Sequence, residues 1–351
     1  MAGAKGYSSY RGREPKLKII LAVFLVLVIL AAAAVIYIQQ NLVVYGDDGR
    51  YRLDLPWQED IAAPDAGTPP EEAPQVELVI QEPEAPPSSL TLSLSAAPLT
   101  MELWEAAQGQ TCDAVCVTLK DTAGSLYFDA AHGVSGGVRT QADTAAALAA
   151  LTGREDVVSV ARFSCLHDPR TANSNVRNLA LRNTGGYIFY DGNNSQWLDP
   201  TKPAAREYLC GLVGEIAALG FDEILLTDLS YPTEGKINKI DYNGDGPLED
   251  NLKLLLTELK AALEPYEGVT LSLELPETVI TAGYDPVSGQ KLADLAPLVD
   301  RVYAVTEPDR AEALAEAVKT AGENTLFVPE LAADDPDLSG PRLVLPAPPE
   351  A

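Results

Sequence analysis

The chain has 351 residues and a hydrophobic content of 46%, enough for one large domain with a buried core and further segments. Its formal net charge is −26, from 51 acidic and 25 basic residues. Such an acidic surface repels nucleic acid, so we expect no nucleic-acid partner. Four cysteines and two histidines are too few and too scattered for a structural zinc site, and we expect no cofactor.

An unbroken apolar segment, residues 19–38, follows a basic tail of residues 1–18. Twenty helical residues span about 30 Å, the thickness of a hydrocarbon core. Because the basic residues precede the segment, the positive-inside rule predicts a single-pass protein of the cell membrane with a cytoplasmic N-terminus and an extracytoplasmic remainder. A cleaved signal peptide is the alternative, since residues 31–34 are all Ala, but the run exceeds a signal core of about 7 to 15 residues.

Two segments without a barrel pattern come next. Residues 41–55 hold two short alternating runs around an Asp-Gly pair, which predicts a juxtamembrane β-hairpin. Residues 56–87 are rich in Pro, Glu and Ala, so they cannot bury enough apolar surface to offset the entropy lost on ordering. We expect a disordered acidic linker that holds the following domain away from the membrane.

Residues 88–346 alternate apolar runs of strand length with helical segments, ahead of a short tail at 347–351. This alternation is typical of α/β proteins with a parallel sheet. Eight strands favour a closed (β/α)8 barrel of the TIM type, in which the C-terminal strand ends hold the chemistry. The strands are predicted near 90–94, 114–120, 157–165, 223–229, 269–275, 301–306, 325–330 and 342–345. The helices are predicted at 100–107, 140–152, 203–219, 249–264, 289–297 and 309–321, with a longer excursion at 170–200.

The four cysteines are expected to be free thiols. Cys112 and Cys116 lie four residues apart in one predicted strand, which separates them by about 13 Å, beyond disulfide reach. A bridge between Cys116 and Cys165, on neighbouring strands, is the alternative.

Several motifs in this region resemble those of a known family. They are Ala161-Arg162-Phe163 through His167-Asp168-Pro169, then Trp197-Leu198-Asp199-Pro200, Arg206-Glu207-Tyr208 and Gly220-Phe221-Asp222-Glu223-Ile224. In this order they resemble the family of putative glycoside hydrolase domains, bacterial TIM barrels often tethered to the cell surface. The resemblance runs over residues 88 to 331 and is densest from 157 to 235. It implies a barrel that acts on or binds a polysaccharide of the envelope or surroundings.

The sequence departs from this resemblance at two strand ends. Thr227 and Thr118 stand where the family usually has Asp. Most glycosidases need two carboxyl groups about 5 to 9.5 Å apart, one to donate a proton and one to attack carbon or activate water. Threonine can do neither. The alternative to an enzyme is therefore an inactive barrel that serves as a carbohydrate-binding, structural or protein-interaction module.

Other carboxylates could replace the missing acids. Glu274 falls where the resemblance suggests an acid on the fifth strand, and it is the preferred catalytic residue, with Asp228 or another acid at the rim, Glu307 or Glu330, as its partner. Because strand side chains alternate, Asp228 should point away from the family position, occupied by Thr227, unless the strand end is bulged. For Glu274 and Asp228 the alternative is a hydrogen-bonded structural role at the rim.

Further residues are candidates for contacts with a glycan. Arg162, inside an apolar strand, needs a buried acid partner and so points into the barrel mouth, as an ion pair or a substrate contact. Tyr187, Tyr190 and Trp197 could stack on sugar rings, although Trp197 could equally pack its loop onto the barrel. The remaining candidates are Asp168, Asp199, Thr227, Glu307 and Glu330.

The segment 241–246 matches the opening of a calcium loop, with Asp241, Asn243 and Asp245 as its oxygen ligands. The twelfth position holds Leu252 instead of the expected acid, and the same sequence is also a favourable turn. We therefore expect no metal, with calcium as the weaker alternative.

Overall fold

The computed structural model describes residues 43–45, 51–53, 89–94, 97–242 and 246–346. The chain divides into two units, residues 1–80 and 81–351. In the first, β1 (Val43–Tyr45) pairs antiparallel with β2 (Tyr51–Leu53). The predicted segments 1–18, 19–38, 56–87 and 347–351 lie outside the described residues. Within the described ranges, no helix is both long and apolar enough to cross a membrane.

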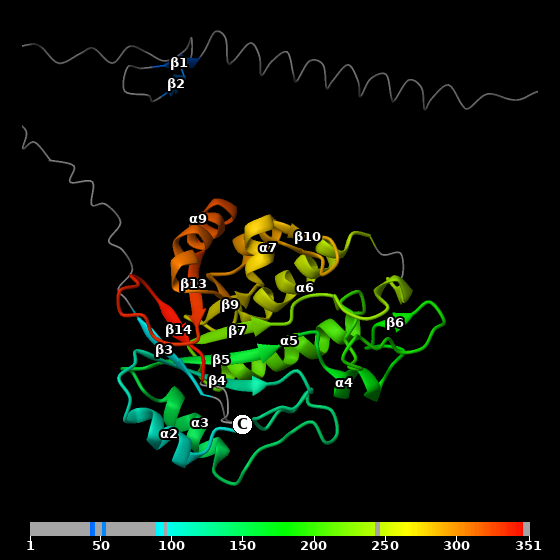
Figure 1. Ribbon diagram of the computed structural model, residues 1–351, viewed down its shortest axis with the longest axis horizontal. Coiled ribbons are helices and arrows are strands. Elements are labelled where there is room, and N and C mark those ends of the chain that lie inside the picture. Colours follow the sequence, from blue (N-terminus) through cyan, green and yellow to red (C-terminus); the bar gives the residue numbers. More distant parts are fainter. Residues whose placement is uncertain (1–42, 46–50, 54–88, 95–96, 243–245, 347–351) are drawn as a thin grey trace, which may run out of the picture. The chain divides into compact units, whose positions relative to one another are not determined.

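The second unit is a closed barrel of eight parallel strands (Figure 1). This confirms the predicted TIM-type barrel and all eight of its strands. Going round the barrel, each strand pairs with the next, and the last returns to the first. The strands are β3 (Leu90–Ser93), β4 (Ala114–Lys120), β5 (Val158–Ser164), β7 (Glu223–Thr227), β9 (Thr270–Glu274), β12 (Arg301–Val305), β13 (Leu326–Leu331) and β14 (Arg342–Val344).

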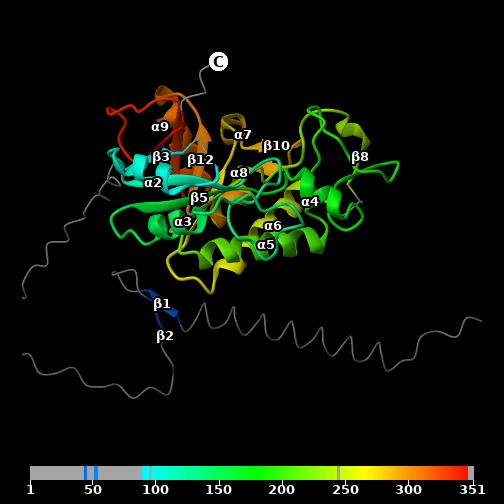
Figure 2. The ribbon, with the colours of Figure 1, turned by 90° about the horizontal axis from the view of Figure 1, so that it is seen from below.

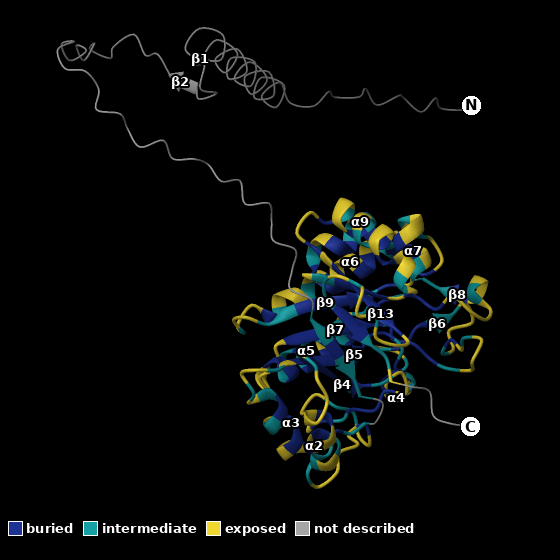
Figure 3. Cartoon of the chain, turned by 60° about the vertical axis from the view of Figure 1, so that its left-hand side comes forward, coloured by how far each residue is buried: buried dark blue, intermediate teal, exposed yellow. Residues whose placement is uncertain are grey.

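Helices cover the outside of the barrel, and their outer faces are exposed (Figure 3). The principal ones are α2 (Met101–Gln108), α3 (Thr144–Thr152), α5 (Pro203–Ala218), α6 (Leu248–Leu263), α8 (Leu292–Leu295) and α9 (Ala311–Ala321). One difference from an eight-helix ring is the connection between β13 and β14, where residues 332–341 form a loop without a helix. Pro336, Gly340 and Pro341 account for this, because Pro and Gly interrupt helices.

Short helices and short strand pairs lie in the connections between the barrel strands. The excursion after β5 holds α4 (Pro169–Ser174) and β6 (Arg182–Asn183), and β6 pairs with β8 (Ile240–Asp241), from the connection after β7. After β9 come α7 (Glu277–Ala282) and the pair β10 (Tyr284–Asp285) and β11 (Gln290–Lys291). Single 3₁₀ turns are η1 (Ile237–Lys239), η2 (Ala296–Leu298) and η3 (Pro308–Arg310).

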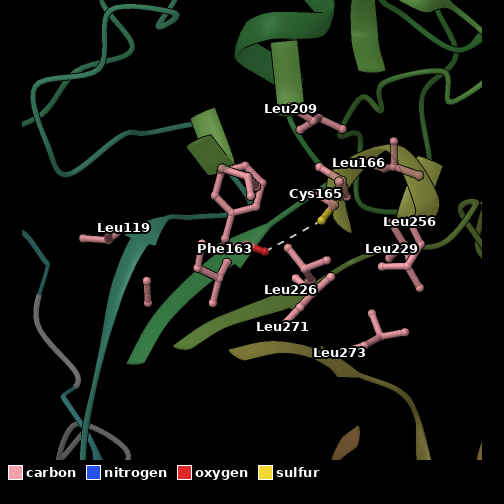
Figure 4. Packing of buried hydrophobic residues seen from close by; sticks show 14 of the residues in the cluster. Leu119, Phe163, Cys165, Leu166, Leu209, Leu226, Leu229, Leu256, Leu271 and Leu273 are labelled. Atoms are coloured by element: carbon pink, nitrogen blue, oxygen red, sulfur yellow. Dashed lines mark hydrogen bonds between the residues drawn. The ribbon is translucent and has the colours of Figure 1, made fainter. Parts of the chain in front are cut away.

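The core has an outer and an inner layer because strand side chains alternate. Outward residues such as Leu119, Phe163 and Leu226 pack against helix residues, including Leu209 of α5 and Leu256 of α6 (Figure 4). The spacing of buried leucines along α6, at 252, 255, 256, 259 and 263, gives the helix one apolar face toward the strands. Seven buried apolar residues form a cluster inside the barrel: Ala114, Cys116, Val160, Leu225, Tyr303, Val328 and Leu343.

The four cysteines are free thiols, as expected. The alternative bridge between Cys116 and Cys165 is wrong, because Cys116 belongs to the inner layer and Cys165 to the outer layer. Their side chains therefore lie on opposite sides of the barrel wall. Burial raises the pKa of the Cys116 thiol to about 11, so it stays protonated at neutral pH.

The N-terminal end of the barrel is closed by a buried polar network around Glu223, the first residue of β7. Its carboxylate accepts hydrogen bonds from Tyr303 (2.8 Å) and Ser272 (2.5 Å) and forms an ion pair with Arg301. On the same strand, the inward-facing Leu225 separates this network from Thr227 at the C-terminal end. The two ends of the barrel are therefore separate polar regions.

Candidate active site

A cavity of about 330 Å³ opens at the C-terminal ends of β4, β5, β7 and β9. This is the end of a parallel barrel at which active sites are built. It brings together Arg162, Thr227, Asp228 and Glu274, four of the predicted site residues, and also Thr118. The other lining residues are Lys120, Asp121, Thr122 and Ser164.

Arg162 connects two carboxylates at the base of this cavity. Its Nη1 donates to Oε2 of Glu274 at 2.7 Å, and its Nη2 donates to both carboxylate oxygens of Glu330, at 2.7 and 2.6 Å. Arg162 was expected to have one buried acid partner, and it has two acid partners, Glu274 and Glu330. Glu330 is fully buried, whereas the Glu274 side chain is 27% exposed. Glu330 therefore holds Arg162 in place, and Glu274 is the carboxyl group that reaches the cavity.

The pKa of Glu274 is raised from 4.5 to about 7. Burial is the largest cause, and the negative charges of Glu330 and Asp228 raise the pKa further, against the opposing effect of Arg162. At neutral pH the carboxyl group therefore carries a proton for a large part of the time. A carboxyl group that is neutral near pH 7 can donate a proton.

This raised pKa predicts a pH-dependent cost of folding. As the pH rises from 4.5 to 7, the unfolded chain releases the Glu274 proton before the folded chain does, so the group destabilises the fold increasingly over that window and fully above it. In Glu274→Gln this cost is absent. Between pH 4 and pH 8 the stability of the variant relative to wild type should increase by up to about 3 kcal/mol. Urea unfolding at both pH values measures this, and identical pH dependences would contradict the shift.

The backbone at the end of β7 brings Asp228 into the cavity. Strand alternation alone would turn Asp228 away from the side on which Thr227 lies. Instead Asp228 adopts a left-handed conformation, with φ of 52°, directly after the last strand residue. Both side chains consequently line the cavity, and Oγ1 of Thr227 donates to Oδ2 of Asp228 at 2.9 Å. Left-handed backbone at a residue other than Gly is uncommon, and such conformations gather at functional sites.

Lys120 forms a second buried ion pair, beside the cavity. A register shift between β4 and β5 at Thr118 and Lys120 marks an irregularity where β4 ends. The Nζ atom of Lys120 lies 3.0 Å from Oδ2 of Asp168 and donates to the carbonyl oxygens of Ser164 (2.6 Å) and Cys165 (3.3 Å). Neither charged side chain of the pair is exposed. The ion pair thus anchors the loop that follows β5.

Asp168 has no room for a substrate contact. Besides Lys120, it accepts from the backbone N–H of Thr171 at 2.8 Å and from the hydroxyl of Tyr208 at 3.1 Å. A Cβ atom placed on Gly124 would lie 2.1 Å from Oδ1 of Asp168, so the loop after β4 covers it closely. Asp168 is therefore enclosed by the protein and lies apart from the cavity lining.

The remaining predicted residues lie outside this cavity. Trp197 is buried, stacks on His167 with a centroid distance of 4.4 Å, and donates from Nε1 to Asp191 at 2.8 Å, so it packs its loop. Asp199 is also buried and accepts from the backbone N–H and the hydroxyl of Thr201. Glu307 is exposed beyond β12 and does not line the cavity. Tyr190 is half exposed and lines a different cavity.

The calcium alternative rests largely on residues outside the described ranges. Asp241 lies in β8, but residues 243–245 are not described. Among the residues for which the structure gives positions, no group of three His, Cys, Asp or Glu side chains could hold a metal ion.

Four lining residues were not predicted from the sequence: Lys120, Asp121, Thr122 and Ser164. Asp121 organises the loop after β4, because its carboxylate accepts from the backbone of Ser125 (2.8 Å) and from the hydroxyl of Tyr127 (2.7 Å). These lining residues could have been predicted in part, because a Lys-Asp-Thr sequence directly follows an apolar run, at the point where a barrel strand reaches its C-terminal end.

Residues 91–317, more than half of the chain, match the family described as "Putative glycosyl hydrolase domain". No curated protein matches. Among solved structures, the PgaB (BpsB) glycoside hydrolase domain from Bordetella bronchiseptica is 16% identical, with a TM-score of 0.47, over 70% of this chain and 84% of its own. A variant of the PelA glycoside hydrolase domain from Pseudomonas aeruginosa is 15% identical, with a TM-score of 0.42, over 74% and 96%. By its family match, the chain belongs to the putative glycosyl hydrolase domain family.

Proposed function

We propose that the barrel, residues 88–346, is a glycoside hydrolase domain that cleaves a polysaccharide, with Glu274 as the general acid and Asp228 as the second carboxylate. One observation carries this proposal. Glu274, with a pKa near 7, and Asp228 line the same cavity at the C-terminal strand ends. Two carboxyl groups with different tasks are what glycosidic cleavage requires.

The contacts of each group suit its task. The Glu274 proton passes to the oxygen of the leaving sugar as the glycosidic bond breaks, and Glu274 becomes a carboxylate. Arg162, 2.7 Å away, stabilises the negative charge that this transfer creates. The Asp228 carboxylate supplies negative charge opposite the positive charge that develops on the sugar ring, and Thr227 orients it by a hydrogen bond. The anomeric carbon then bonds to the oxygen of a water molecule, whose proton passes to Asp228 or, where Asp228 has first bonded to that carbon, to Glu274.

Asp228→Asn tests the second carboxylate without disturbing the backbone, because Asn tolerates the left-handed conformation as well as Asp does. We expect the release of reducing ends from purified envelope glycans to fall by at least about 100-fold, a typical effect of removing a group that acts on the transition state. The unfolding temperature should change little. Release at the wild-type rate would eliminate Asp228 as a catalytic residue.

A glycan-binding barrel without catalysis is the second candidate. It is favoured by Thr118 and Thr227, which line the cavity at positions where the family resemblance places Asp. Such a barrel would bind a glycan but would release no reducing ends from it, with or without Asp228→Asn. A purely structural or protein-interaction module would bind no glycan at all.

We further propose that residues 19–38 anchor the domain in the cell membrane, with residues 1–18 in the cytoplasm and the barrel outside. The support is the length of the apolar segment and the basic residues that precede it. Full-length protein should sediment with membranes and resist extraction at high salt. A signal-peptide fusion that lacks residues 1–40 should be secreted in soluble form. Full-length protein in the soluble fraction would contradict the anchor.

A further inference from the structure

A second cavity, of about 690 Å³, lies outside the candidate active site. It is formed by two segments that are distant in the sequence, 183–191 and 235–239. The first belongs to the excursion after β5 and the second to the connection after β7, and the pairing of β6 with β8 joins them. In Figure 1 the arrowheads of β4 and β5 point toward the side on which β6 lies, and Figure 2 shows β8 on that side too. The cavity therefore lies on the side of the barrel to which the C-terminal ends of these strands point.

Two exposed aromatic rings border this cavity. Tyr187 is 75% exposed and Tyr190 is 47% exposed. A tight turn fixes Tyr187, because Gly186 has φ of 81° and Oδ1 of Asn183 accepts from the backbone of Gly185 (2.9 Å) and Tyr187 (3.2 Å). The ring of Tyr187 also lies beside Gly185. Exposed tyrosines present flat apolar area with a polar handle, which suits the face of a sugar ring.

The same cavity carries positive charge on a strongly acidic chain. Lys236 and Lys239 line it, and both are exposed. Within the described part of the chain, neither ammonium group forms an ion pair. The one acidic lining residue, Asp191, is engaged by Trp197 and by the backbone of Asn193 and Ser195. The two lysines are therefore available to an anionic ligand.

We propose that this cavity binds an acidic polysaccharide, with sugar rings stacked on Tyr187 and Tyr190 and sugar carboxylates paired with Lys236 and Lys239. The proposal rests on the proposed function, because it makes the cavity a remote subsite for the same polymer. The connections that form it leave from β5 and β7, the strands that bring Arg162 and Asp228 to the active site. A polymer bound there would therefore lie at the same end of the barrel as the active site.

The test measures binding separately from cleavage. Full-length protein carrying Glu274→Gln is titrated with polygalacturonate, and with dextran and polyglutamate for comparison. We expect binding to polygalacturonate that weakens as salt rises, since the paired charges are exposed to solvent. Adding Lys236→Glu and Lys239→Glu should weaken it at least about tenfold, or 1.4 kcal/mol. Tyr187→Ala should weaken it too. Lys319→Glu, a charge reversal of the same kind at one exposed lysine in the last turn of α9, should have no effect.

Several results would overturn the proposal. The first two are that the protein does not bind polygalacturonate, or that the lysine variant binds it as tightly as the Lys319→Glu control does. The other two are that the protein prefers neutral dextran, or that it binds polyglutamate, which has carboxylates but no sugar rings, as tightly as polygalacturonate. The proposed function fails by a different result, namely undiminished release of reducing ends by Glu274→Gln. The unfolding temperature of each variant shows whether the surface substitutions leave the fold intact.

Discussion

Replacing Glu274 by Gln is expected to lower kcat for glycan cleavage by about 10²- to 10⁴-fold, the usual contribution of a general acid. The amide has nearly the shape of the carboxyl group and can keep the hydrogen bond from Arg162, but it cannot give a proton to the leaving oxygen. KM should therefore change much less than kcat. Reducing-end release from purified envelope glycans, measured over a range of substrate concentrations, separates the two constants.

Two controls make the Glu274→Gln result specific. Glu307→Gln alters an exposed rim acid that does not line the cavity, and it should leave kcat unchanged. An activated aryl glycoside, whose leaving group needs no proton, should lose far less rate in Glu274→Gln than a natural glycan does. Equal losses on both substrates would show that Glu274 positions the sugar and does not protonate it. A rate within twofold of wild type on both would remove it from the mechanism.

Replacing Asp168 by Asn should destabilise the barrel by about 3 kcal/mol or more, because it leaves the buried ammonium of Lys120 without its ion-pair partner. The Asn oxygen can replace Oδ1, which accepts from Thr171, but the NH2 group then replaces Oδ2, which faces Lys120 and accepts from Tyr208. The substitution therefore removes the charge and one hydrogen-bond acceptor. The matched control is Asp156→Asn, which removes an exposed partner of Arg154 and should leave stability almost unchanged. Urea unfolding measures both.

A double variant isolates the ion pair. Lys120→Met removes the cation that Asp168→Asn leaves unpaired, so the double variant should be more stable than Asp168→Asn alone. If Asp168→Asn lowers the free energy of unfolding no more than Asp156→Asn does, the buried ion pair does not stabilise the fold in the way that its geometry implies. If the double variant is less stable than Asp168→Asn alone, the unpaired charge of Lys120 is not the cause of the destabilisation.

Much of the barrel could be predicted because each strand is an apolar run bounded by turn residues. All eight predicted strands are present, and the two shortest, β3 and β14, pair with each other to close the barrel. Strand ends in a parallel barrel converge, so sequence position alone indicated that Glu274 and Arg162 would lie near each other. Their contact joins residues 112 positions apart.

The parts that could not be predicted depend on backbone conformation and on how loops fold back. The left-handed backbone of Asp228 brings its side chain into the cavity, whereas strand alternation predicted the opposite direction. Asp168 and Trp197 sit in motifs of the family, yet both hold loops in place: one pairs with Lys120 and the other stacks on His167. A polar residue in a motif does not reveal whether its partner is substrate or protein.

The proposed chemistry depends on whether Glu274 holds a proton at neutral pH. The most direct measurement is the titration of its side-chain carboxyl carbon by NMR in protein labelled with ¹³C-glutamate, with Glu274→Gln used to assign the signal. The burial of Glu274, together with the charges of Glu330 and Asp228, predicts a midpoint near pH 7. A midpoint near the ordinary 4.5 would mean that the group is ionised at neutral pH and cannot act as the acid.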